Sequence, residues 1–358
     1  MKVIQVIPNL YMGGAEIMCE TLTLELIKAG VEVVVVSLYN YETPITQRMV
    51  KAGARIEFLD KKPGMDLSII RKLKTLFEQE KPDVVHSHLN AQKYAMFAAK
   101  QAAIPVCVHT VHSVAEKELN RIDKFLAKRF YKKDGVIPVA LSDLIQETIV
   151  SVYGMSSDAI PVILNGINLS KCLKKSDYTI GDTVKILHIG RFSEEKNHKG
   201  LIDAFKKFHA VYPDSTLSLI GEGVIFDDIK KYAADNGLER EIAFLGLQTS
   251  VHQFINEADI FVLPSLYEGV PMTLIEAMGT AIPIVATNVG GIPNMLVNNE
   301  SAILTSVDSD EIANAFLRLS GDMELRKRLG ENALIRANAF SAKEMAHQYI
   351  KIYQSSIK

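Results

Sequence analysis

Cysteine is scarce in this sequence, and long hydrophobic runs are absent. The chain of 358 residues holds three cysteines, Cys19, Cys107 and Cys172, which lie far apart and form no CxxC pair. Such spacing argues against a disulfide framework or a cysteine-ligated zinc site, and it suits a reducing cytoplasm. No run approaches the ~18 apolar residues of a membrane-spanning helix. The first residues, MKVIQVIPNL, are too short an apolar run for a signal peptide. We therefore expect a cytoplasmic protein that does not cross a membrane.

An excess of charge of one sign is also missing. The net charge is −2, with 48% hydrophobic and 23% charged residues, which is typical of a globular protein. Bulk electrostatics give no reason to expect a nucleic-acid partner, and we predict none. Because a single hydrophobic core stops growing at roughly 250–300 residues, the length favours two domains.

Short β-branched runs alternate with amphipathic stretches along the chain. Apolar runs of this kind are typical of strands buried on both faces of a parallel sheet, and the alternation predicts an α/β fold. The predicted strands are VIQVI, VEVVVVSL, RIEFL, DVVHSH, VCVHTVH and GVIPVA, and then KILHIG, TLSLIG, IAFLG, DIFVLPS, PIVAT and SAILT. The polar segment 165–183 between the two series is predicted to be a linker. We expect an N-terminal domain over 1–168, joined by a C-terminal helix at about 342–358, and a second domain over 180–341.

Ligands of doubly wound sheets bind beyond the carboxyl ends of the strands, so the residues there are the candidates. Gly13 and Gly14 follow the first strand and open a helix, where backbone amides can approach an anion; a plain tight turn is the alternative. Arg191 and Lys196 follow the strand KILHIG and could hold a diphosphate, although Glu194 and Glu195 make a solvated loop the alternative.

The stretch YEGVPMTLIEAMG (267–279) places two glutamates around a helix start. Pro271 suits the first helical position, so the amides of Met272 and Thr273 would be free to bind a phosphate. Glu276 could accept hydrogen bonds from the vicinal hydroxyls of a ribose. Glu268 could accept from hydroxyls beyond the phosphates. The arrangement predicts a nucleotide-sugar site.

At this point the chain resembles a known family. The pattern Glu268-x7-Glu276, with "NLYMGGAE", "VVHSHL", "HTVHS", "LNGIN", "IGRFSEEKNHKGLIDAF" and "LIGEGVIFDDIKKYA", is similar to the family 4 glycosyltransferases, often called group 1, over nearly the whole chain. Within this family, the sequence pattern is similar to that of the bacterial exopolysaccharide and capsule transferases. The resemblance implies the GT-B fold, with two Rossmann-like domains facing a deep cleft and a C-terminal helix that crosses back to the N-terminal domain. It also implies retention of anomeric configuration, no cofactor and no required metal.

The resemblance assigns roles to residues of this chain. It implies that His112 lies near the donor sugar and the acceptor, and that Gly14 lets the first domain close on the donor. The residues predicted at the reacting bond are His112, Arg191, Lys196 and Glu268. Those predicted to bind the donor are Gly13, Gly14, Arg191, Lys196, Glu268, Gly269, Met272, Thr273 and Glu276. His88 and Asn165 are predicted on the acceptor side.

Some positions depart from the family pattern. Asn168 replaces the usual aspartate of "NGID", Asn294 ends the usual "GGIPE", and Ala281 stands where glycine is common. Val270-Pro271 replaces a frequent Phe-Gly. This change alters the loop over the donor sugar, so the resemblance does not identify the sugar.

The chemistry that the family implies needs few groups. Breaking a sugar–phosphate bond builds negative charge on the leaving diphosphate, and fixed donors there are the largest expected catalytic effect. The departing phosphate can take the acceptor's proton, so we assign His112 to orientation, with a general base as the alternative. Asp308-Ser309-Asp310 resembles a metal-binding DxD, but its place before EIANAFLRL predicts a helix cap. His86 and His88 share a strand face, and we expect them to line the cleft rather than bind zinc.

The segment 117–133 is basic and carries Leu119, Ile122, Phe125, Leu126 and Phe130 at helical spacing. A helix of this kind can dock on anionic lipid, and the alternative is a surface helix that packs on the sheet. We therefore predict a retaining hexosyltransferase that uses a nucleotide sugar, UDP-linked by preference, and a saccharide or polyprenyl-linked acceptor, with peripheral membrane contact through 117–133. The alternatives are a GDP-mannose-dependent mannosyltransferase, a nucleotide-sugar 2-epimerase and a catalytically silent binding subunit.

Overall fold

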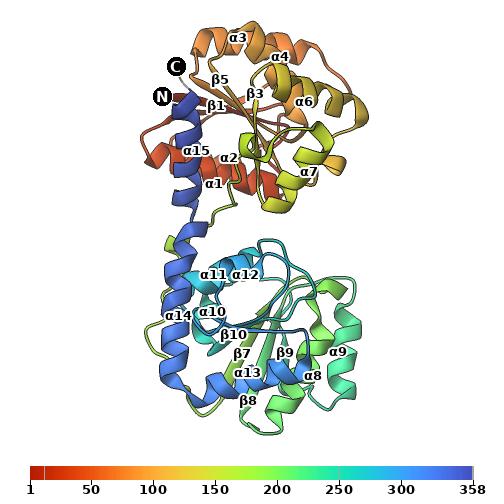
Figure 1. The fold of residues 1–358 in the computed structure, drawn as a ribbon, viewed down its shortest axis with the longest axis vertical. Helices are drawn as coiled ribbons and strands as arrows, with labels where there is room; N and C mark the ends of the chain where they lie inside the picture. Colours follow the sequence, from red (N-terminus) through yellow and green to blue (C-terminus); the bar gives the residue numbers. More distant parts are fainter. Residues whose placement is uncertain (12, 249, 357–358) are drawn as a thin grey trace. The chain divides into compact units, whose positions relative to one another are not determined.

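A computed structural model describes residues 1–11, 13–248 and 250–356 of the chain. Contacts divide it into two compact units, one of residues 1–166 with 342–358 and the other of residues 167–341. Each unit is built on one parallel six-stranded sheet with helices on its faces (Figure 1). The α/β class predicted from the sequence is confirmed.

The first sheet has the order β3-β2-β1-β4-β5-β6, so the chain moves outward from β1 to one edge and then from β4 to the other. All its neighbouring strands are parallel. Its strands are β1 (Lys2–Ile7), β2 (Glu32–Ser37), β3 (Arg55–Phe58), β4 (Val84–His88), β5 (Val106–Val111) and β6 (Ile137–Ala140). The helices of this unit are α1 (Gly14–Lys28), α2 (Pro44–Lys51), α3 (Ser68–Glu80), α4 (Gln92–Gln101), α5 (Ala115–Glu118), α6 (Arg121–Lys133), α7 (Asp143–Tyr153) and α15 (Ala342–Ser356).

The second sheet has the order β12-β11-β10-β7-β8-β9, which reverses direction between β7 and β10. Its strands are β7 (Val184–Ile189), β8 (Ser215–Ile220), β9 (Ile242–Phe244), β10 (Ile260–Leu263), β11 (Ile284–Thr287) and β12 (Ile303–Thr305). The helices of this unit are α8 (His198–His209), α9 (Phe226–Asp235), α10 (His252–Glu257), α11 (Met272–Thr280), α12 (Ile292–Met295), α13 (Ser309–Gly321) and α14 (Met323–Ala337).

Apolar side chains fill both faces of the first sheet, as the continuous β-branched runs require. On one face α3, α4, α6 and α7 cover a core that includes Phe77 and Phe130. On the other face α1, α2 and α15 cover a second core, to which the C-terminal helix contributes Tyr349 and Tyr353. The C-terminal helix therefore returns to the N-terminal unit, as expected from the sequence.

The segment predicted to be a linker, 165–183, is packed more tightly than its polar composition indicates. The side chain of Lys175 is buried and donates to the carbonyls of Asn256 and Ala258 at 3.2 and 2.7 Å. Tyr178 is buried as well and donates to the carbonyl of Ala281 at 3.0 Å. The contacts therefore assign residues 167–179 to the second unit, whereas the sequence prediction began that domain at residue 180.

Local signals explain several helix ends. Thr43 and Thr46 form a reciprocal capping box at the start of α2. The side chain of Asp308 accepts from the amides of Asp310 and Glu311, so the DxD sequence is a helix cap, as predicted. Ala281 ends α11 in the left-handed conformation, with φ of +60°. Glycine adopts this conformation without strain, so an alanine is an unusual residue here.

Candidate functional site

The second unit holds every predicted donor residue except Gly13 and Gly14, on the segments that follow β7 and β10, where the strand order reverses. This is the place in an open α/β sheet where loops diverge and leave room for a ligand. The loop after β7 spans residues 190–197, and the loop after β10 spans residues 264–271. A backbone hydrogen bond joins the two loops: the amide of Leu266 donates to the carbonyl of Glu195 at 2.8 Å.

Lys196 and Glu268 form an ion pair at this switch point. The Nζ of Lys196 lies 2.6 Å from Oε1 of Glu268, and the same oxygen accepts from the hydroxyl of Ser265 at 2.6 Å. The side chain of Glu268 is only 7% exposed and that of Lys196 is 18% exposed. The carboxylate is therefore held by two donors through one oxygen, while Oε2 forms no hydrogen bond with the described residues.

The loop that carries Glu268 is fixed by its neighbours on both sides. Asn197 adopts a left-handed conformation, with φ of +54°, and its side chain donates to the carbonyl of Pro264 at 3.1 Å. On the other side, Thr287 donates to the carbonyl of Ser265 at 2.6 Å. Gly290 has φ of +53°, and a Cβ atom on it would lie 1.9 Å from the carbonyl oxygen of Glu268. Only glycine fits this close approach.

Backbone also packs on backbone where the loops after β7, β8 and β9 meet. Gly221, with φ of +139°, lies so close to the loop after β7 that a Cβ atom would be 2.0 Å from the carbonyl oxygen of Gly190. Its amide donates to the carbonyl of Gly246 at 2.9 Å. The three turns therefore meet mostly through main-chain atoms.

The start of α11 is one residue later than the sequence predicted. Pro271 is the N-cap residue and Met272 is the first helical residue, because the extended ψ of 118° at Pro271 is not helical. The amides of Met272 and Thr273 donate to no group among the described residues, whereas those of Leu274 and Ile275 bond the carbonyl of Pro271. Two free amides at a helix start favour an anion.

Glu276 lies one turn into α11 and is partly buried. Burial raises the pKa of its carboxyl to about 7, which the charge of Lys171 counteracts only in part. Arg191 is exposed, and its guanidinium forms no ion pair or hydrogen bond with the residues described. Gly269 has nothing within 4 Å of the place that a Cβ atom would take. Arg191 and Glu276 are therefore both available to a ligand, in contrast to the paired Lys196.

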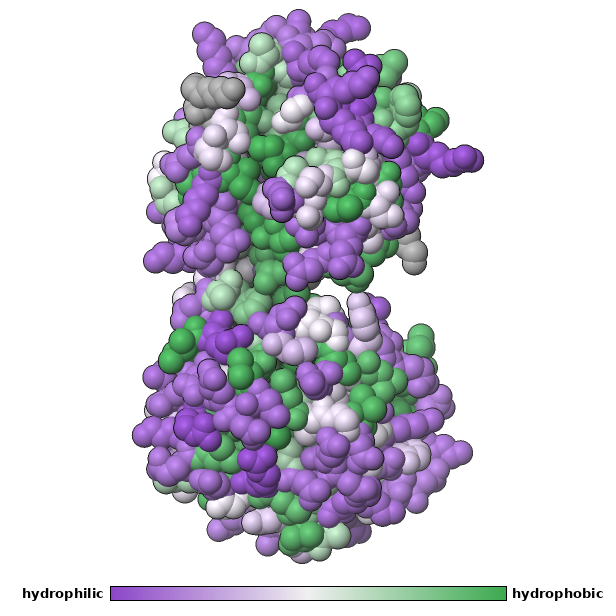
Figure 2. Space-filling view, viewed as in Figure 1, coloured by the Kyte–Doolittle hydropathy of each residue, from purple (hydrophilic) through white to green (hydrophobic). Residues whose placement is uncertain are grey.

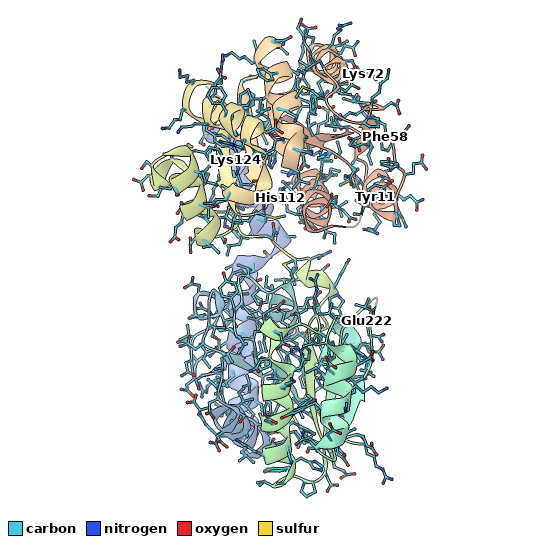
Figure 3. All side chains as sticks on the ribbon, turned by 90° about the vertical axis from the view of Figure 1, so that its right-hand side faces the viewer. Tyr11, Phe58, Lys72, His112, Lys124 and Glu222 are labelled. Carbon is cyan, nitrogen blue, oxygen red and sulfur yellow. The ribbon has the colours of Figure 1, made fainter. Side chains whose placement is uncertain are left out.

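In the first unit the predicted residues also follow strands, and Figure 3 shows Tyr11 and His112 at the same end of that unit. Gly13 is the N-cap residue of α1 and Gly14 its first residue. Nothing lies within 4 Å of the position that a Cβ atom on Gly14 would take, so the backbone there is open to close approach. The carboxylate of Glu16, in the first turn, folds back to Gly13.

His88 lies beneath His112. Its side chain is fully buried, with Nδ1 at 3.1 Å from Nε2 of His112 and Nε2 at 3.0 Å from Oε1 of Gln5. Both ring nitrogens are thus engaged within the protein, so His88 supports His112 instead of presenting a nitrogen to an acceptor. Burial lowers the pKa of His112 to about 4, which keeps the partly exposed ring neutral at pH 7.

His86 does not line a surface either. It is fully buried, with Nδ1 at 2.8 Å from the hydroxyl of Tyr353 and Nε2 at 2.7 Å from the hydroxyl of Thr110, which in turn bonds Tyr349 at 2.8 Å. These bonds attach the C-terminal helix α15 to the first sheet. The expectation that His86 lines a cleft is therefore wrong, because α15 covers this strand face.

Asn165 is partly buried, and its Oδ1 is a buried acceptor to which none of the described residues donates a hydrogen bond. Three residues that support the predicted ones, Ser265, Gln5 and Glu118, were missed by the sequence analysis. Glu118 accepts from the amide of His112 at 3.0 Å, and burial raises its pKa to about 8. A polar residue inside an apolar strand, as Gln5 is in VIQVI, was the only available signal.

The basic segment 117–133 forms two helices instead of one. α5 ends at Glu118 and α6 begins at Arg121, because Asn120 caps the second helix by accepting from the amides of Ile122 and Asp123. Asp123 is buried and paired with Lys93 of α4 at 2.8 Å, which fixes the rotation of α6.

That rotation divides the predicted apolar stripe. Leu119 and Phe130 are buried, whereas Ile122 is 67% and Phe125 is 73% exposed. Arg121, Lys124 and Lys128 line one surface hollow together with Phe125. Hydrophobic residues also reach the largely hydrophilic surface elsewhere on this unit (Figure 2). None of the helices in the described part of the chain has the length and apolar character needed to span a bilayer.

Comparisons with known proteins agree with this architecture. The model of the glycosyl transferases group 1 matches residues 173–336, and that of glycosyltransferase family 4 matches residues 12–171. An Escherichia coli UDP-Gal:alpha-D-GlcNAc-diphosphoundecaprenol alpha-1,3-galactosyltransferase is 29% identical over 280 residues, which cover 73% of this chain and 72% of that protein.

Two solved structures show the same fold at low sequence identity. A glycosyltransferase from Rickettsia africae superposes with a TM-score of 0.81 at 19% identity, covering 100% of this chain and 98% of the other. Anabaena HepE in complex with UDP superposes with a TM-score of 0.79 at 19% identity, covering 99% of this chain and 100% of the other. The predicted GT-B fold is confirmed by these likenesses.

Proposed function

We propose a specific reaction for this chain on the premise that it belongs to the group 1 glycosyltransferases of family 4. It transfers a sugar from a UDP-sugar to a lipid-linked saccharide. The transfer retains the anomeric configuration and needs no metal ion. The coarser activity, glycosyl transfer, follows from the family. The donor nucleotide, the stereochemistry, the acceptor and the residue roles are our proposal.

The observation that supports the donor site best is the convergence at the switch point of the second sheet. Within the described part of the chain, Arg191 has no ion-pair or hydrogen-bond partner, the amides of Met272 and Thr273 donate to no group, and Lys196 lies against Glu268. These groups would bind the diphosphate and stabilise the negative charge that builds on it as the sugar–phosphate bond breaks. Each charged hydrogen bond of this kind contributes about 1.5–3 kcal/mol. Cationic side chains and helix amides would thus do the work that a metal ion does in other transferases.

The remaining roles follow from position. Glu276, one turn inside α11, would accept from the ribose hydroxyls, and Oε2 of Glu268 would accept from a hydroxyl of the transferred sugar. Gly13, Gly14 and Gly269 would let main chain approach the donor. His112 would orient a hydroxyl, because a ring with a pKa of about 4 is a weak base at pH 7. The leaving phosphate would then take the acceptor's proton on the same face of the sugar, which retains the configuration.

Two relatives support the choice of substrates. The Escherichia coli relative uses UDP-Gal and a diphosphoundecaprenol-linked acceptor, and the structure of HepE holds UDP. We propose that this chain reaches a membrane-bound acceptor through α6, whose exposed Ile122 and Phe125 lie among basic residues. His88 and Asn165 would support the acceptor side, His88 indirectly through His112.

Calorimetric titration with UDP and with GDP, each with and without EDTA, tests the donor site. We expect UDP to bind, EDTA to have no effect, and Lys196→Ala or Glu276→Ala to weaken binding about tenfold or more. Lys199→Ala is the matched control, because this exposed lysine follows in α8 and contacts the ring of Tyr232. Preference for GDP would replace the donor assignment, and the absence of binding by either nucleotide would overturn it.

Product analysis tests the reaction. The coupling constant of the new anomeric proton, measured by NMR before any equilibration, should report retention. A net inversion would contradict the proposal. Conversion of the donor sugar without any acceptor would instead indicate an epimerase on the same fold.

A further inference from the structure

A buried chain of hydrogen bonds runs from α1 through β1 and β4 to His112. Thr23 donates to the carbonyl of Cys19 at 2.8 Å, and Nε2 of Gln5 donates to the hydroxyl of Thr23 at 2.7 Å. Oε1 of Gln5 lies 3.0 Å from Nε2 of His88, and Nδ1 of His88 lies 3.1 Å from Nε2 of His112. Thr23, Gln5 and His88 are all fully buried, so these groups bond one another and not bulk water.

The direction of every bond in this chain follows from its first member. A hydroxyl has one proton, and that of Thr23 is used on the carbonyl of Cys19, so its oxygen must accept from the amide nitrogen of Gln5. The carbonyl oxygen of Gln5 then faces His88 and can only accept. The thiol of Cys19, at 3.5 Å from the same oxygen, is a donor too and agrees with this orientation.

Two consequences follow for the imidazoles. Nε2 of His88 must carry a proton in order to donate to Gln5, and burial lowers the pKa of His88 well below its usual value, which keeps this ring neutral. A neutral imidazole has one N–H, so Nδ1 of His88 is an acceptor. Nε2 of His112 must therefore hold the proton of that ring, and its Nδ1 holds a lone pair.

Nδ1 of His112 is the open end of the chain. It forms no hydrogen bond with the described residues, and the side chain is partly exposed. A lone pair at that atom accepts a hydrogen bond from a hydroxyl or an ammonium group and repels the oxygen of a phosphate.

We propose that Gln5 and Thr23 are positioning residues that fix the tautomer of His112, with the proton on Nε2, so that the site presents an obligate hydrogen-bond acceptor to a hydroxyl of the substrate. The tautomer is a property of the free protein. Only the identity of the group that His112 meets rests on the proposed glycosyl transfer.

Long-range proton–nitrogen NMR correlation on protein with ¹⁵N-labelled histidine tests the tautomer at pH 7. We expect a protonated Nε2 and an unprotonated Nδ1 in His112, with its signals assigned by their loss in His112→Gln. Gln5→Met keeps the length of the side chain but removes the acceptor, so His88 loses its fixed orientation and His112 should show a mixture of both tautomers. Thr23→Val releases the amide of Gln5 and should give a mixture as well.

Thr110→Val is the matched control, because it removes a buried hydroxyl from the neighbouring network of His86 and leaves the chain from Gln5 to His112 intact. Its His112 signals should match those of the unaltered protein. A proton on Nδ1 in the unaltered protein, or an unchanged tautomer in both Gln5→Met and Thr23→Val, would overturn the proposal.

Steady-state kinetics separate this inference from the proposed function. Gln5→Met should lower kcat/KM about tenfold, the value of about one hydrogen bond, with the affinity for UDP unchanged. If no transfer is found with any donor, the proposed function fails while the NMR result still decides the tautomer. If Gln5→Met changes the tautomer of His112 but leaves kcat/KM unchanged, the proposed contact between His112 and a substrate hydroxyl is contradicted.

Discussion

The ammonium group of Lys196 lies 2.6 Å from a carboxylate oxygen of Glu268, across 72 positions of the sequence. The residue predicted to bind the diphosphate and the residue predicted to bind the sugar are therefore partners of each other. If the donor binds as proposed, it would replace part of this ion pair, so the two side chains would act as one unit. The following predictions start from this pair and from the groups around it.

A double-mutant cycle should reveal the coupling of Lys196 with Glu268. Lys196→Met leaves a nearly buried carboxylate without its cation, which should lower the free energy of unfolding by about 1–3 kcal/mol. Glu268→Gln in the same protein should recover part of that loss, because no unpaired charge remains. Urea denaturation at pH 7 measures all four proteins. Additive losses would show that the ion pair has no energetic weight.

Affinity for UDP should depend on pH through Glu276. In the free protein its pKa of about 7 means that the carboxyl is mostly protonated below pH 7 and ionised above it. Ribose hydroxyls bind the ionised form better, so affinity should rise with pH and improve about tenfold between pH 5.5 and 7.5. Glu276→Gln should flatten that dependence. A titration series by calorimetry measures it, and equal slopes in both proteins would exclude Glu276 as the ribose ligand.

Gly290→Ala should distort the loop that carries Glu268, although the two residues lie apart in the sequence. The new methyl group would lie 1.9 Å from the carbonyl oxygen of Glu268, at a residue whose φ of +53° alanine rarely adopts. The loop must shift, so we expect about 2 kcal/mol less stability and weaker UDP binding. Gly321→Ala is the control, because a Cβ atom there would meet nothing within 4 Å. Thermal unfolding with and without UDP compares the two, and an equal effect of both changes would refute the close-approach argument.

Membrane binding should depend on the two exposed apolar residues of α6. Ile122→Ser with Phe125→Ser removes side chains that could enter a lipid interface, and should reduce sedimentation with phosphatidylglycerol vesicles about tenfold or more. Salt should weaken the binding of the unaltered protein, since basic residues flank these positions.

A matched pair elsewhere controls for surface hydrophobicity. Met65→Ser with Leu67→Ser alters residues that are 65% and 67% exposed outside α6, and should leave vesicle binding unchanged. Equal binding of the unaltered protein to neutral and anionic vesicles would contradict the electrostatic part of the proposal.

The amino-acid sequence by itself determined the two parallel sheets and the positions of the candidate ligand-binding residues after their strands. Buried parallel strands need continuous apolar runs, so VEVVVVSL and DIFVLPS identify strands without any knowledge of their neighbours. Helix caps are equally local, which is why the cap at Asp308 was predictable. Motif spacing placed Arg191, Glu268 and Glu276 after strands, and the resemblance that they carry led to the family.

The tertiary structure decided what these residues contact. The pairing of Lys196 with Glu268, the packing of the 165–183 segment and the burial of His86 under α15 all depend on groups that meet only after folding. The outward face of α6 depends on Asp123 reaching Lys93 of another helix. Which ring nitrogen of His112 carries the proton depends, in our proposal, on Gln5 of β1. Hydrogen bonds and ion pairs act over a few ångströms, so partners that are distant in sequence leave no local pattern from which to predict them.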